Sequence, residues 1–483
     1  MSGRLFTYAE MAEATGGEWF LSVDRARGDG GRLDELGVSS VSTSTKVDCA
    51  GALFVAIKGE RVDAHAFLPE AAKAGAAAVC VRKDFGRGNI PGGVDALLVE
   101  DTLVAYQALA RYHRRRLAGL KVVALTGSSG KTSTKDILRD VLQAGFGKEA
   151  VYATEGNTNN HVGVPQNLLR LRENHRIAII EMGTNHPGEI AVLTAIAEPD
   201  AGIVVSIGPA HLEFFGDTDG VAKEKGTIFA KLRPGGVAVI PADGPGCSIL
   251  ASLSGPFRMV TFGEVPVADV SCSYIKGGLA GSSFRLMTKS GRSAEVSWRL
   301  RGAHQARNAA AAAATAMSLG MSFDQVVDAL SACEVGGMRT RVREIRGVTW
   351  VNDAYNANPA SVKAGLSWLA GCYAERRRVF LVLGDMLELG EASERNHVEV
   401  LAFALRSMPS TGTCEVILCL VGPRMAKAVG QIPAAAGARL FGASADAADF
   451  LKRFLQEGDL IYLKGSHSIA LEKIEAAWEA DSP

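Results

Sequence analysis

The chain has 483 residues, too long for one ordinary hydrophobic core, and this length predicts about three domains. Its 52 Lys and Arg side chains balance its 52 Asp and Glu side chains, so composition gives no support to a nucleic-acid partner. The start of the chain lacks the features of a signal peptide, the apolar stretch at 309–321 is too short to span a bilayer, and the eight cysteines include no C-x-x-C pair. We therefore expect a cytoplasmic globular protein with no membrane or nucleic-acid partner and no zinc site.

The first block, 1–117, predicts a small α/β domain. Apolar runs at 53–57 and 78–81 are typical of buried strands, and an Ala-rich helical stretch lies between them at 68–78. A basic cluster at 111–116 closes the block, and we interpret it as a solvated helix end before a linker.

The second block, 118–334, alternates apolar strands with helical patterns, which predicts a doubly wound parallel sheet with helices on both faces. From 270 to 301 the pattern changes to period-two alternation with Gly-rich turns, which indicates a small antiparallel sheet in the same domain. An Ala-rich helix follows at 309–316. The predicted parallel strands are 122–125, 177–180, 203–207 and 237–240.

The third block, 335–483, repeats the strand–helix alternation and predicts a second doubly wound, Rossmann-like sheet. Its strand candidates are 379–383, 416–421 and 460–463. The fold class is therefore α/β with three domains.

The strongest motif is T-G-S-S-G-K-T at 126–132, which follows an apolar strand and opens a helix. It is a phosphate-binding loop with a shorter spacing between its glycines than usual. The glycines let backbone N–H groups point at phosphate oxygens, Lys131 neutralises phosphate charge, and the Thr132 hydroxyl can bind Mg²⁺. The residues that we expect to bind ATP here are Gly127, Ser128, Ser129, Gly130, Lys131, Thr132 and Ser133.

Polar side chains follow two neighbouring strands of the same predicted sheet. Glu181 comes directly after one apolar strand, and His211 lies shortly after the next. A carboxylate beside a phosphate loop is a typical Mg²⁺ ligand, whereas a lone histidine is more often structural. Because His211 reaches the edge that holds Glu181 and Thr132, we include it in the site. Spacing alone would assign Lys223 and Lys225 to a solvated helix face.

Several longer strings closely resemble the Mur ligases, in the order that this family has them. They are T-G-S-S-G-K-T-S-T, E-G-N-T-N-N-H-V-G-V-P at 155–165, E-M-G-T-N-H-P-G-E-I at 181–190, G-P-A-H-L-E-F-F-G at 208–216 and V-A-K-E-K-G at 221–226. The strings N-D-A-Y-N-A-N-P-A-S at 352–361 and L-G-D-M-L-E-L-G at 383–390 favour the member that adds D-alanyl-D-alanine to UDP-N-acetylmuramoyl-tripeptide.

The resemblance implies a UDP-sugar domain at 1–117, an ATP-binding domain at 118–334 and a closing domain at 335–483. It also implies that Lys225, rather than Lys223, carries a carbamate derived from CO₂. Two Mg²⁺ ions would then be bound by Thr132, Glu181, His211 and Lys225, and the catalytic residues would be Lys131, Glu181, His211 and Lys225. A hinge at 336–337 would allow domain closure.

The remaining site residues also follow from the resemblance. His304, Asn308, Arg339 and Asp353 match positions that contact the nucleotide. Residues that match substrate-binding positions are Ser42, Thr43, Ser44, Lys46, Lys58, Asn157, Thr158, Asn159, Asn160, Thr184, Asn185, Tyr355, Asn356, Asn358, Lys464 and Ser466. The chain departs from the usual family residues at Ser44, Lys46, Gln305 and His467, and Lys does not replace Arg in planar, bidentate recognition.

We therefore expect a monomeric, ATP-dependent ligase that forms an amide by way of an acyl phosphate in peptidoglycan precursor synthesis. Three alternatives stay open: a sibling Mur-type or folylpolyglutamate-type ligase, a P-loop NTPase or kinase, and a silent paralogue that only binds. The 355–359 string argues against the first. A kinase leaves 157–160, Lys225 and the third domain without a role. A silent paralogue would not need the residues that are intact here, which are Lys131, Thr132, Glu181, His211 and Lys225.

Overall fold

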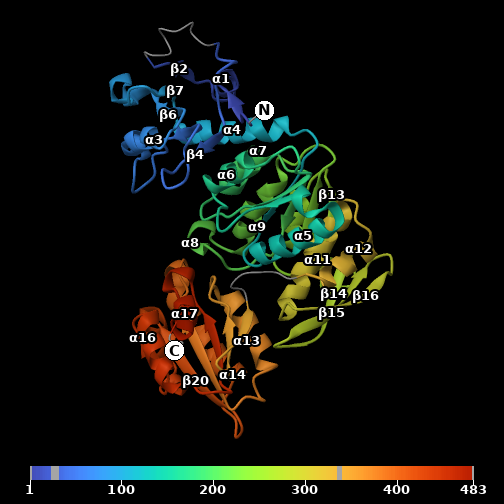
Figure 1. The fold of residues 1–483 in the computed structure, drawn as a ribbon. Coiled ribbons are helices and arrows are strands. Elements are labelled where there is room, and N and C mark those ends of the chain that lie inside the picture. Colours follow the sequence, from blue (N-terminus) through green and yellow to red (C-terminus); the bar gives the residue numbers. More distant parts are fainter. Residues whose placement is uncertain (1–2, 23–31, 334–339, 481–483) are drawn as a thin grey trace.

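The computed structural model describes residues 3–22, 32–333 and 340–480, and these form three α/β regions arranged in a row (Figure 1). The N-terminal region lies at the opposite end of the molecule from the C-terminal region, with the central region between them. Arg339 and the predicted hinge at 336–337 lie outside the described residues. Within the described ranges, no helix combines the length and the apolar character that crossing a membrane requires.

The N-terminal region is built on a sheet with the strand order β2-β7-β6-β5-β4. β4 to β7 run parallel, and β2 pairs antiparallel with β7. The strands are β2 (Glu18–Phe20), β4 (Ser40–Ser42), β5 (Ala52–Val55), β6 (Ala78–Arg82) and β7 (Asp95–Val99), with a separate pair β1 (Phe6–Thr7) and β3 (Gly37–Val38). The helices are α1 (Tyr8–Thr15), α3 (Leu68–Lys73) and α4 (Thr102–Arg116).

Helix α4 joins the N-terminal region to the central region, and the basic cluster at its end, which the sequence pattern predicts to be solvated, is solvated only in part. Arg114 is only 1% exposed, and its guanidinium pairs with Asp200 at 2.9 Å. Arg111 and Arg115 both pair with Glu198. Arg114 is buried because α4 packs against helices of the central region, whose acidic loop supplies the compensating charge, whereas Arg111 and Arg115 stay exposed in their ion pairs.

The central region contains one mixed sheet with the strand order β16-β15-β14-β13-β12-β11-β8-β10-β9. The antiparallel strands predicted for 270–301 form, and they extend the main sheet because β14 pairs with β13. The strands are β8 (Lys121–Thr126), β9 (Val151–Ala153), β10 (Ile177–Glu181), β11 (Ala201–Val204), β12 (Val237–Pro241), β13 (Arg258–Gly263), β14 (Val270–Gly278), β15 (Gly281–Thr288) and β16 (Ser293–Trp298).

Alternate residues of the central strands enter two different cores, as strand geometry requires. Val123 and Leu125 pack with α5 (Lys131–Phe146), α11 (Ala303–Ser318) and α12 (Phe323–Ser331). Val122 and Ala124 pack on the other face, in a core that also includes residues of α4 and of the N-terminal sheet. The helices on that face are α6 (Gly163–Leu169), α7 (Glu189–Ala197), α9 (Thr218–Gly226) and α10 (Cys247–Leu253), and the short α8 (Leu212–Phe215) precedes α9.

The C-terminal region has a sheet with the order β17-β18-β22-β19-β20-β21, parallel except for the β17–β18 pair. Its strands are β17 (Arg341–Ile345), β18 (Val348–Asn352), β19 (Arg378–Gly384), β20 (Glu415–Val421), β21 (Arg439–Phe441) and β22 (Leu460–Lys464). One face is covered by α13 (Pro359–Ala370), α14 (Ser393–Ser407) and α15 (Pro423–Val429), and the other by α16 (Ser444–Phe454) and α17 (Glu472–Ala480). The α/β class predicted from the sequence is confirmed, whereas the domain boundaries at 117 and 334 stay predictions.

Candidate active site

The glycine-rich loop lies between β8 and α5 and is tied to the segment that follows β11. Ser128 Oγ donates to the Gly208 carbonyl at 3.0 Å, and the Ser129 N–H donates to Ser206 Oγ at 3.0 Å. Gly130 has a φ of 79°, and a Cβ at this position would lie 2.7 Å from Asn308 Oδ1. Only glycine meets both conditions without strain, so the loop keeps its shape and Asn308 lies beside it.

Lys131 opens α5, and its ammonium donates to the Gly127 carbonyl at 2.8 Å, within the loop itself. Thr132 lies half-buried in the first helical turn, and Ser133 is buried. This places the lysine and the threonine at a helix N-terminus, where backbone N–H groups and the helix dipole favour an anion.

Glu181 ends β10, next to β8 in the sheet, and is only 2% exposed. Its Oε1 accepts a hydrogen bond from Asn159 Nδ2 at 3.0 Å, whereas its Oε2 is buried with no hydrogen-bond partner in the described chain. A buried carboxylate oxygen without a partner is costly, and a hard oxygen is the type of ligand that Mg²⁺ prefers. The donor set at Glu181 therefore fits a bound cation.

His211 and Lys225 face Lys131 across the carboxyl edge of the sheet. His211 has a left-handed backbone with a φ of 51°. Burial, followed by the positive charges of Lys225 and Lys131, lowers the pKa of His211 to about 4. Lys225 is 2% exposed, and burial together with Lys131 lowers the pKa of its ammonium to about 7. The structure thus brings these three predicted residues close together. It favours the neutral imidazole of His211, and it makes the neutral amine of Lys225 more accessible than in an exposed lysine.

Glu224 is a residue of this site that the sequence interpretation missed. Its carboxylate accepts from the Gly188 N–H at 2.8 Å and from the Ile190 N–H at 3.0 Å. It therefore caps the start of α7 and fixes the orientation of α9, which carries Lys225. A carboxylate between two lysines has no sequence signal for this role, because the partner is the end of a helix in another part of the chain.

The two predicted substrate residues after Glu181 are held by the same helix end. Thr184 Oγ1 donates to Glu189 Oε2 at 3.1 Å, and the Asn185 N–H donates to the same oxygen at 2.7 Å. The Asn185 side chain is exposed. The backbone of the segment is therefore fixed, and Asn185 is available to a ligand.

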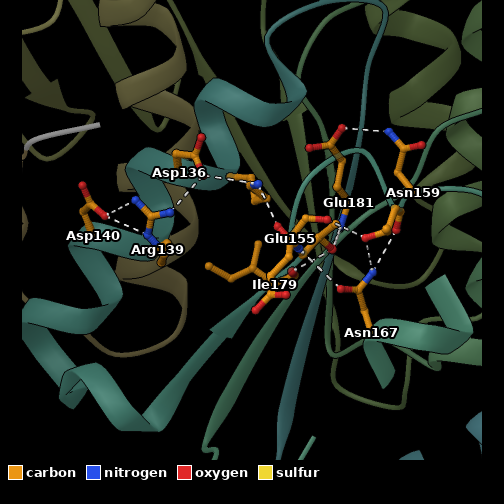
Figure 2. A network of polar contacts seen from close by, with 11 residues as sticks. Asp136, Arg139, Asp140, Glu155, Asn159, Asn167, Ile179 and Glu181 are labelled. Atoms are coloured by element: carbon orange, nitrogen blue, oxygen red, sulfur yellow. Dashed lines mark hydrogen bonds and ion pairs between the residues drawn. The ribbon is translucent and has the colours of Figure 1, made fainter. Parts of the chain in front are cut away.

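The loop at 155–162 contains Asn157, Thr158, Asn159 and Asn160, and it brings Asn159 to the same edge, beside Glu181 (Figure 2). Asn159 reaches Glu181, as described above, and the Gly183 N–H donates to the Asn159 carbonyl at 2.8 Å. Asn160 Oδ1 accepts from the Gly163 N–H at 2.9 Å and so starts α6. Asn157 and Asn160 are exposed, whereas Thr158 and Asn159 are half-buried.

On the predicted nucleotide side, Asn308 Nδ2 donates to Gln305 Oε1 at 3.0 Å, and both residues are buried. Gln305, where the family usually has Asn, therefore holds Asn308 against the glycine-rich loop. His304 lies one turn earlier on α11, near Asp353 and Lys464 of the C-terminal region. Burial lowers the pKa of His304 to about 4, against the opposite effect of Asp353.

The Asp353 carboxylate is directed into the protein. It accepts from Lys464 Nζ at 2.8 Å, from the Tyr462 hydroxyl at 3.2 Å and from the Thr340 N–H at 3.2 Å. Lys464 Nζ also donates to the carbonyls of Asp353 at 3.2 Å and Asn356 at 3.0 Å. In this arrangement, the two residues predicted to contact nucleotide and substrate bind each other and hold the 353–358 loop.

The other predicted residues of the C-terminal region have mixed placements. Asn358 caps α13 by accepting from the Ser361 N–H at 2.8 Å, and Ser466 Oγ accepts from the Leu387 N–H at 2.9 Å. The Tyr355 ring lies 6.1 Å from the His467 ring. Asn356 is exposed. Asn358 and Ser466 thus have structural roles here.

The predicted uridine-side residues lie in the N-terminal region, at and after β4. The Ser42 hydroxyl donates to the Ser44 carbonyl at 2.9 Å, and the Lys46 N–H donates to Ser44 Oγ at 3.2 Å, which shapes a turn. Thr43 is half-buried, and the side chains of Lys46 and Lys58 are exposed. These residues form a separate surface, and their contact with a nucleotide sugar stays a prediction.

Fold and site together define a P-loop nucleotide-binding enzyme in which a second α/β region follows the nucleotide-binding sheet. The Mur ligase middle domain model matches residues 125–316, and the model of the Mur ligase glutamate ligase domain matches residues 338–467. The UDP-N-acetylmuramoyl-tripeptide--D-alanyl-D-alanine ligase of Escherichia coli is 38% identical over 371 residues, which are 76% of this chain and 78% of that protein. The chain belongs to the Mur ligase family.

Solved structures agree over more than nine-tenths of the chain. MurF from Acinetobacter baumannii superimposes with a TM-score of 0.86 at 29% identity and covers 99% of each chain. The MurF ligase of Thermotoga maritima in complex with ADP has a TM-score of 0.77 at 27% identity and covers 92% of this chain and 97% of that one.

Proposed function

We propose that this protein is an ATP-dependent, ADP-forming ligase that adds D-alanyl-D-alanine to UDP-N-acetylmuramoyl-tripeptide. The product, UDP-N-acetylmuramoyl-pentapeptide, is the cytoplasmic precursor of peptidoglycan and serves cell wall growth, shape and division. The single observation that carries the proposal is that Lys131, His211 and Lys225 lie within electrostatic reach of one another, at the sheet edge where Glu181 ends β10, in a chain whose relatives bear this activity.

The reaction has two steps that the site residues can support. The tripeptide carboxylate attacks the γ-phosphate of ATP, which gives an acyl phosphate and releases ADP. The amine of D-alanyl-D-alanine then attacks the acyl carbon, phosphate leaves with the C–O bonding pair, and an amide forms after the amine loses a proton. Lys131 stabilises the negative charge that develops on the transferred phosphoryl group.

The oxygen and nitrogen donors at this edge suit two Mg²⁺ ions. Thr132 and Glu181 would hold one, and His211 and a carbamate on Lys225 would hold the other; when bound, these ions supply positive charge beside the phosphates and the substrate carboxylate. The lowered pKa of Lys225 supports the carbamate, because only the neutral amine reacts with CO₂. No three His, Cys, Asp or Glu side chains cluster as a metal site within 3–22, 32–333 and 340–480, so the proposed set depends on Thr132 and Lys225.

The test is phosphate release from ATP with magnesium and UDP-N-acetylmuramoyl-tripeptide, with and without D-alanyl-D-alanine, together with the mass of the product. We expect release that requires both substrates and a product heavier by the dipeptide less one water. Release without the dipeptide, or with a single amino acid in its place, would contradict the proposal and favour a simple NTPase or a sibling ligase.

A Lys131→Ala variant sharpens the same test. Loss of the loop cation should lower the rate of ligation by roughly 100-fold or more, because the charge on the transferred phosphoryl group then has no fixed ammonium beside it. Full activity in this variant would exclude the proposed site.

A further inference from the structure

Asn167 is a fully buried asparagine in the apolar helix α6, and every polar atom of its side chain is in use. Its Nδ2 donates to the Thr158 carbonyl at 2.8 Å, to Thr158 Oγ1 at 2.9 Å and to the Gly163 carbonyl at 2.7 Å. Its Oδ1 accepts from the Tyr152 hydroxyl at 2.7 Å and from the Glu155 N–H at 3.4 Å. Four of these five partner groups lie in one short segment, 155–163. They are the Glu155 N–H at its start, the carbonyl and hydroxyl of Thr158 in its middle, and the Gly163 carbonyl at its end.

This segment is the loop that presents Asn157 and Asn160 to solvent at the sheet edge. It contains few apolar side chains that could anchor it, so its order depends on polar contacts. Gly163 shows how closely it is folded, since a Cβ there would lie 2.4 Å from the Thr158 carbonyl carbon. Asn167 thus bonds to backbone groups on both sides of this fold, the Glu155 N–H and the Thr158 carbonyl.

The loop in turn fixes the orientation of the Glu181 carboxylate (Figure 2). Asn159 holds Oε1 of Glu181 at 3.0 Å, which leaves Oε2 as the oxygen without a partner. The Glu181 N–H donates to Thr154 Oγ1 at 2.9 Å, and the Thr154 carbonyl accepts from Lys135 Nζ at 2.8 Å. Lys135 lies one turn after Lys131 on α5 and is buried. The start of the loop is thus fixed to the helix that carries the phosphate-binding lysine.

Space filling alone does not account for Asn167. A leucine would fill a buried position in α6 without the cost of desolvating an amide. The carbonyls of Thr158 and Gly163 can only accept, so they fix the NH₂ group of the amide toward them, and the amide oxygen is left to accept from the Tyr152 hydroxyl. The amide therefore has one orientation, in which its NH₂ group faces Thr158. Thr158 directly precedes Asn159, which orients Glu181.

We infer that Asn167 is a positioning residue, which holds the 155–162 loop so that Asn159 orients Glu181 for a divalent cation and Asn157 and Asn160 face the nucleotide-sugar peptide. This inference rests on the proposed function for the identity of the substrate, but not for the order of the loop. Asn167 does not touch the reacting atoms and acts through Thr158 and Asn159.

The experiment compares Asn167→Asp with Tyr152→Phe in the full chain. Asn167→Asp keeps the shape and the acceptor for Tyr152 but removes both N–H donors. We expect hydrogen exchange of 155–162 to accelerate and the magnesium concentration for half-maximal ADP binding, measured by calorimetry, to rise roughly 10- to 100-fold, as for other residues that orient metal ligands. Tyr152→Phe keeps both donors and should raise this concentration by less than Asn167→Asp.

Steady-state kinetics separate positioning from a general loss of structure. In Asn167→Asp, the KM for UDP-N-acetylmuramoyl-tripeptide should rise, whereas the KM for D-alanyl-D-alanine should stay within a factor of about two, because the 353–358 loop is untouched. A folded Asn167→Asp protein with wild-type loop exchange and wild-type magnesium dependence would overturn the inference. Should this variant fail to fold, Tyr152→Phe decides: an unchanged magnesium dependence overturns the inference, and a raised one supports it.

The measurements distinguish a failure of the proposed function from a failure of the inference about Asn167. A wild-type protein that makes no pentapeptide product removes the proposed substrates, while loop exchange and magnesium-dependent ADP binding still test Asn167. A wild-type protein that ligates normally, with an Asn167→Asp variant that differs in neither readout, removes the inference and leaves the proposed function in place.

Discussion

Two buried carboxylates stand at the carboxyl ends of parallel strands in different sheets, and their neighbours give them opposite states. Glu181, at the end of β10, has one oxygen bonded to Asn159 and one without a partner. Asp353, just after β18, has its carboxylate bonded to Lys464, Tyr462 and the Thr340 N–H. Position on the fold and burial are similar, so neither property distinguishes a ligand-binding carboxylate from a structural one.

The difference lies in how the cost of burial is met. A buried carboxylate is unfavourable unless charge and hydrogen bonds compensate it. Asp353 is compensated within the protein by Lys464, which in turn holds the backbone of the 353–358 loop. Glu181 is compensated only in part, which is the state expected of a group that completes its contacts with a bound cation. Substitutions of these two carboxylates and of their neighbours test this contrast.

Lys464→Met should have the largest effect on stability. Removal of the ammonium leaves the Asp353 carboxylate buried without its countercharge, which typically costs about 3–5 kcal/mol. Chemical denaturation of the full chain measures the loss. Adding Asp353→Asn should recover part of it, and a double variant no more stable than Lys464→Met would show that the ion pair is not the cause.

Glu181→Gln should instead abolish most activity and leave stability almost unchanged. The amide keeps the shape but weakens cation binding, so we expect ligation to fall by roughly 100- to 1000-fold. The exposed Glu173→Gln is the matched control and should keep wild-type activity. A strongly destabilised Glu181→Gln protein would mean that the Glu181 carboxylate supports the fold, as the Asp353 carboxylate does, and would contradict the proposed contrast.

His304, which faces Asp353 and Lys464, should make this part of the protein sensitive to acid. Its folded pKa of about 4 lies below the ordinary value of 6.5, so the unfolded chain binds more protons between these pH values. Stability therefore falls as pH drops from about 6.5 toward 4, by up to about 3 kcal/mol for one histidine. The change in unfolding free energy with pH should be smaller in His304→Gln, and an identical pH profile would exclude this role.

Tyr462→Phe should have the smallest effect. It removes one of the hydrogen bonds to Asp353 and leaves the ion pair with Lys464, so we expect a loss of about 1 kcal/mol. Thermal unfolding beside Lys464→Met measures it. A loss as large as that of Lys464→Met would mean that the hydroxyl, rather than the ammonium, compensates the carboxylate.

The α/β class and the glycine-rich loop could be predicted without the structure, because both depend on local patterns. Strand–helix alternation predicts parallel sheets, and a strand followed by T-G-S-S-G-K-T and a helix predicts a phosphate loop wherever it occurs. The sequence also placed Glu181 at the sheet edge, since the carboxyl ends of neighbouring parallel strands meet there. The identity of Lys225 came from resemblance to the family, and not from spacing.

The partners of the buried polar groups could not be predicted in this way, because they come from distant parts of the chain. In the sequence, the basic end of α4 is typical of a solvated surface. In the structure, Asp200 and Glu198 of the central region form ion pairs with it. Asn167 and Glu224 have no sequence signal, because their roles depend on backbone groups that folding brings to them. Hydrogen bonds and ion pairs between distant segments decide whether a buried polar residue supports the fold or serves the site, and local sequence does not contain those partners.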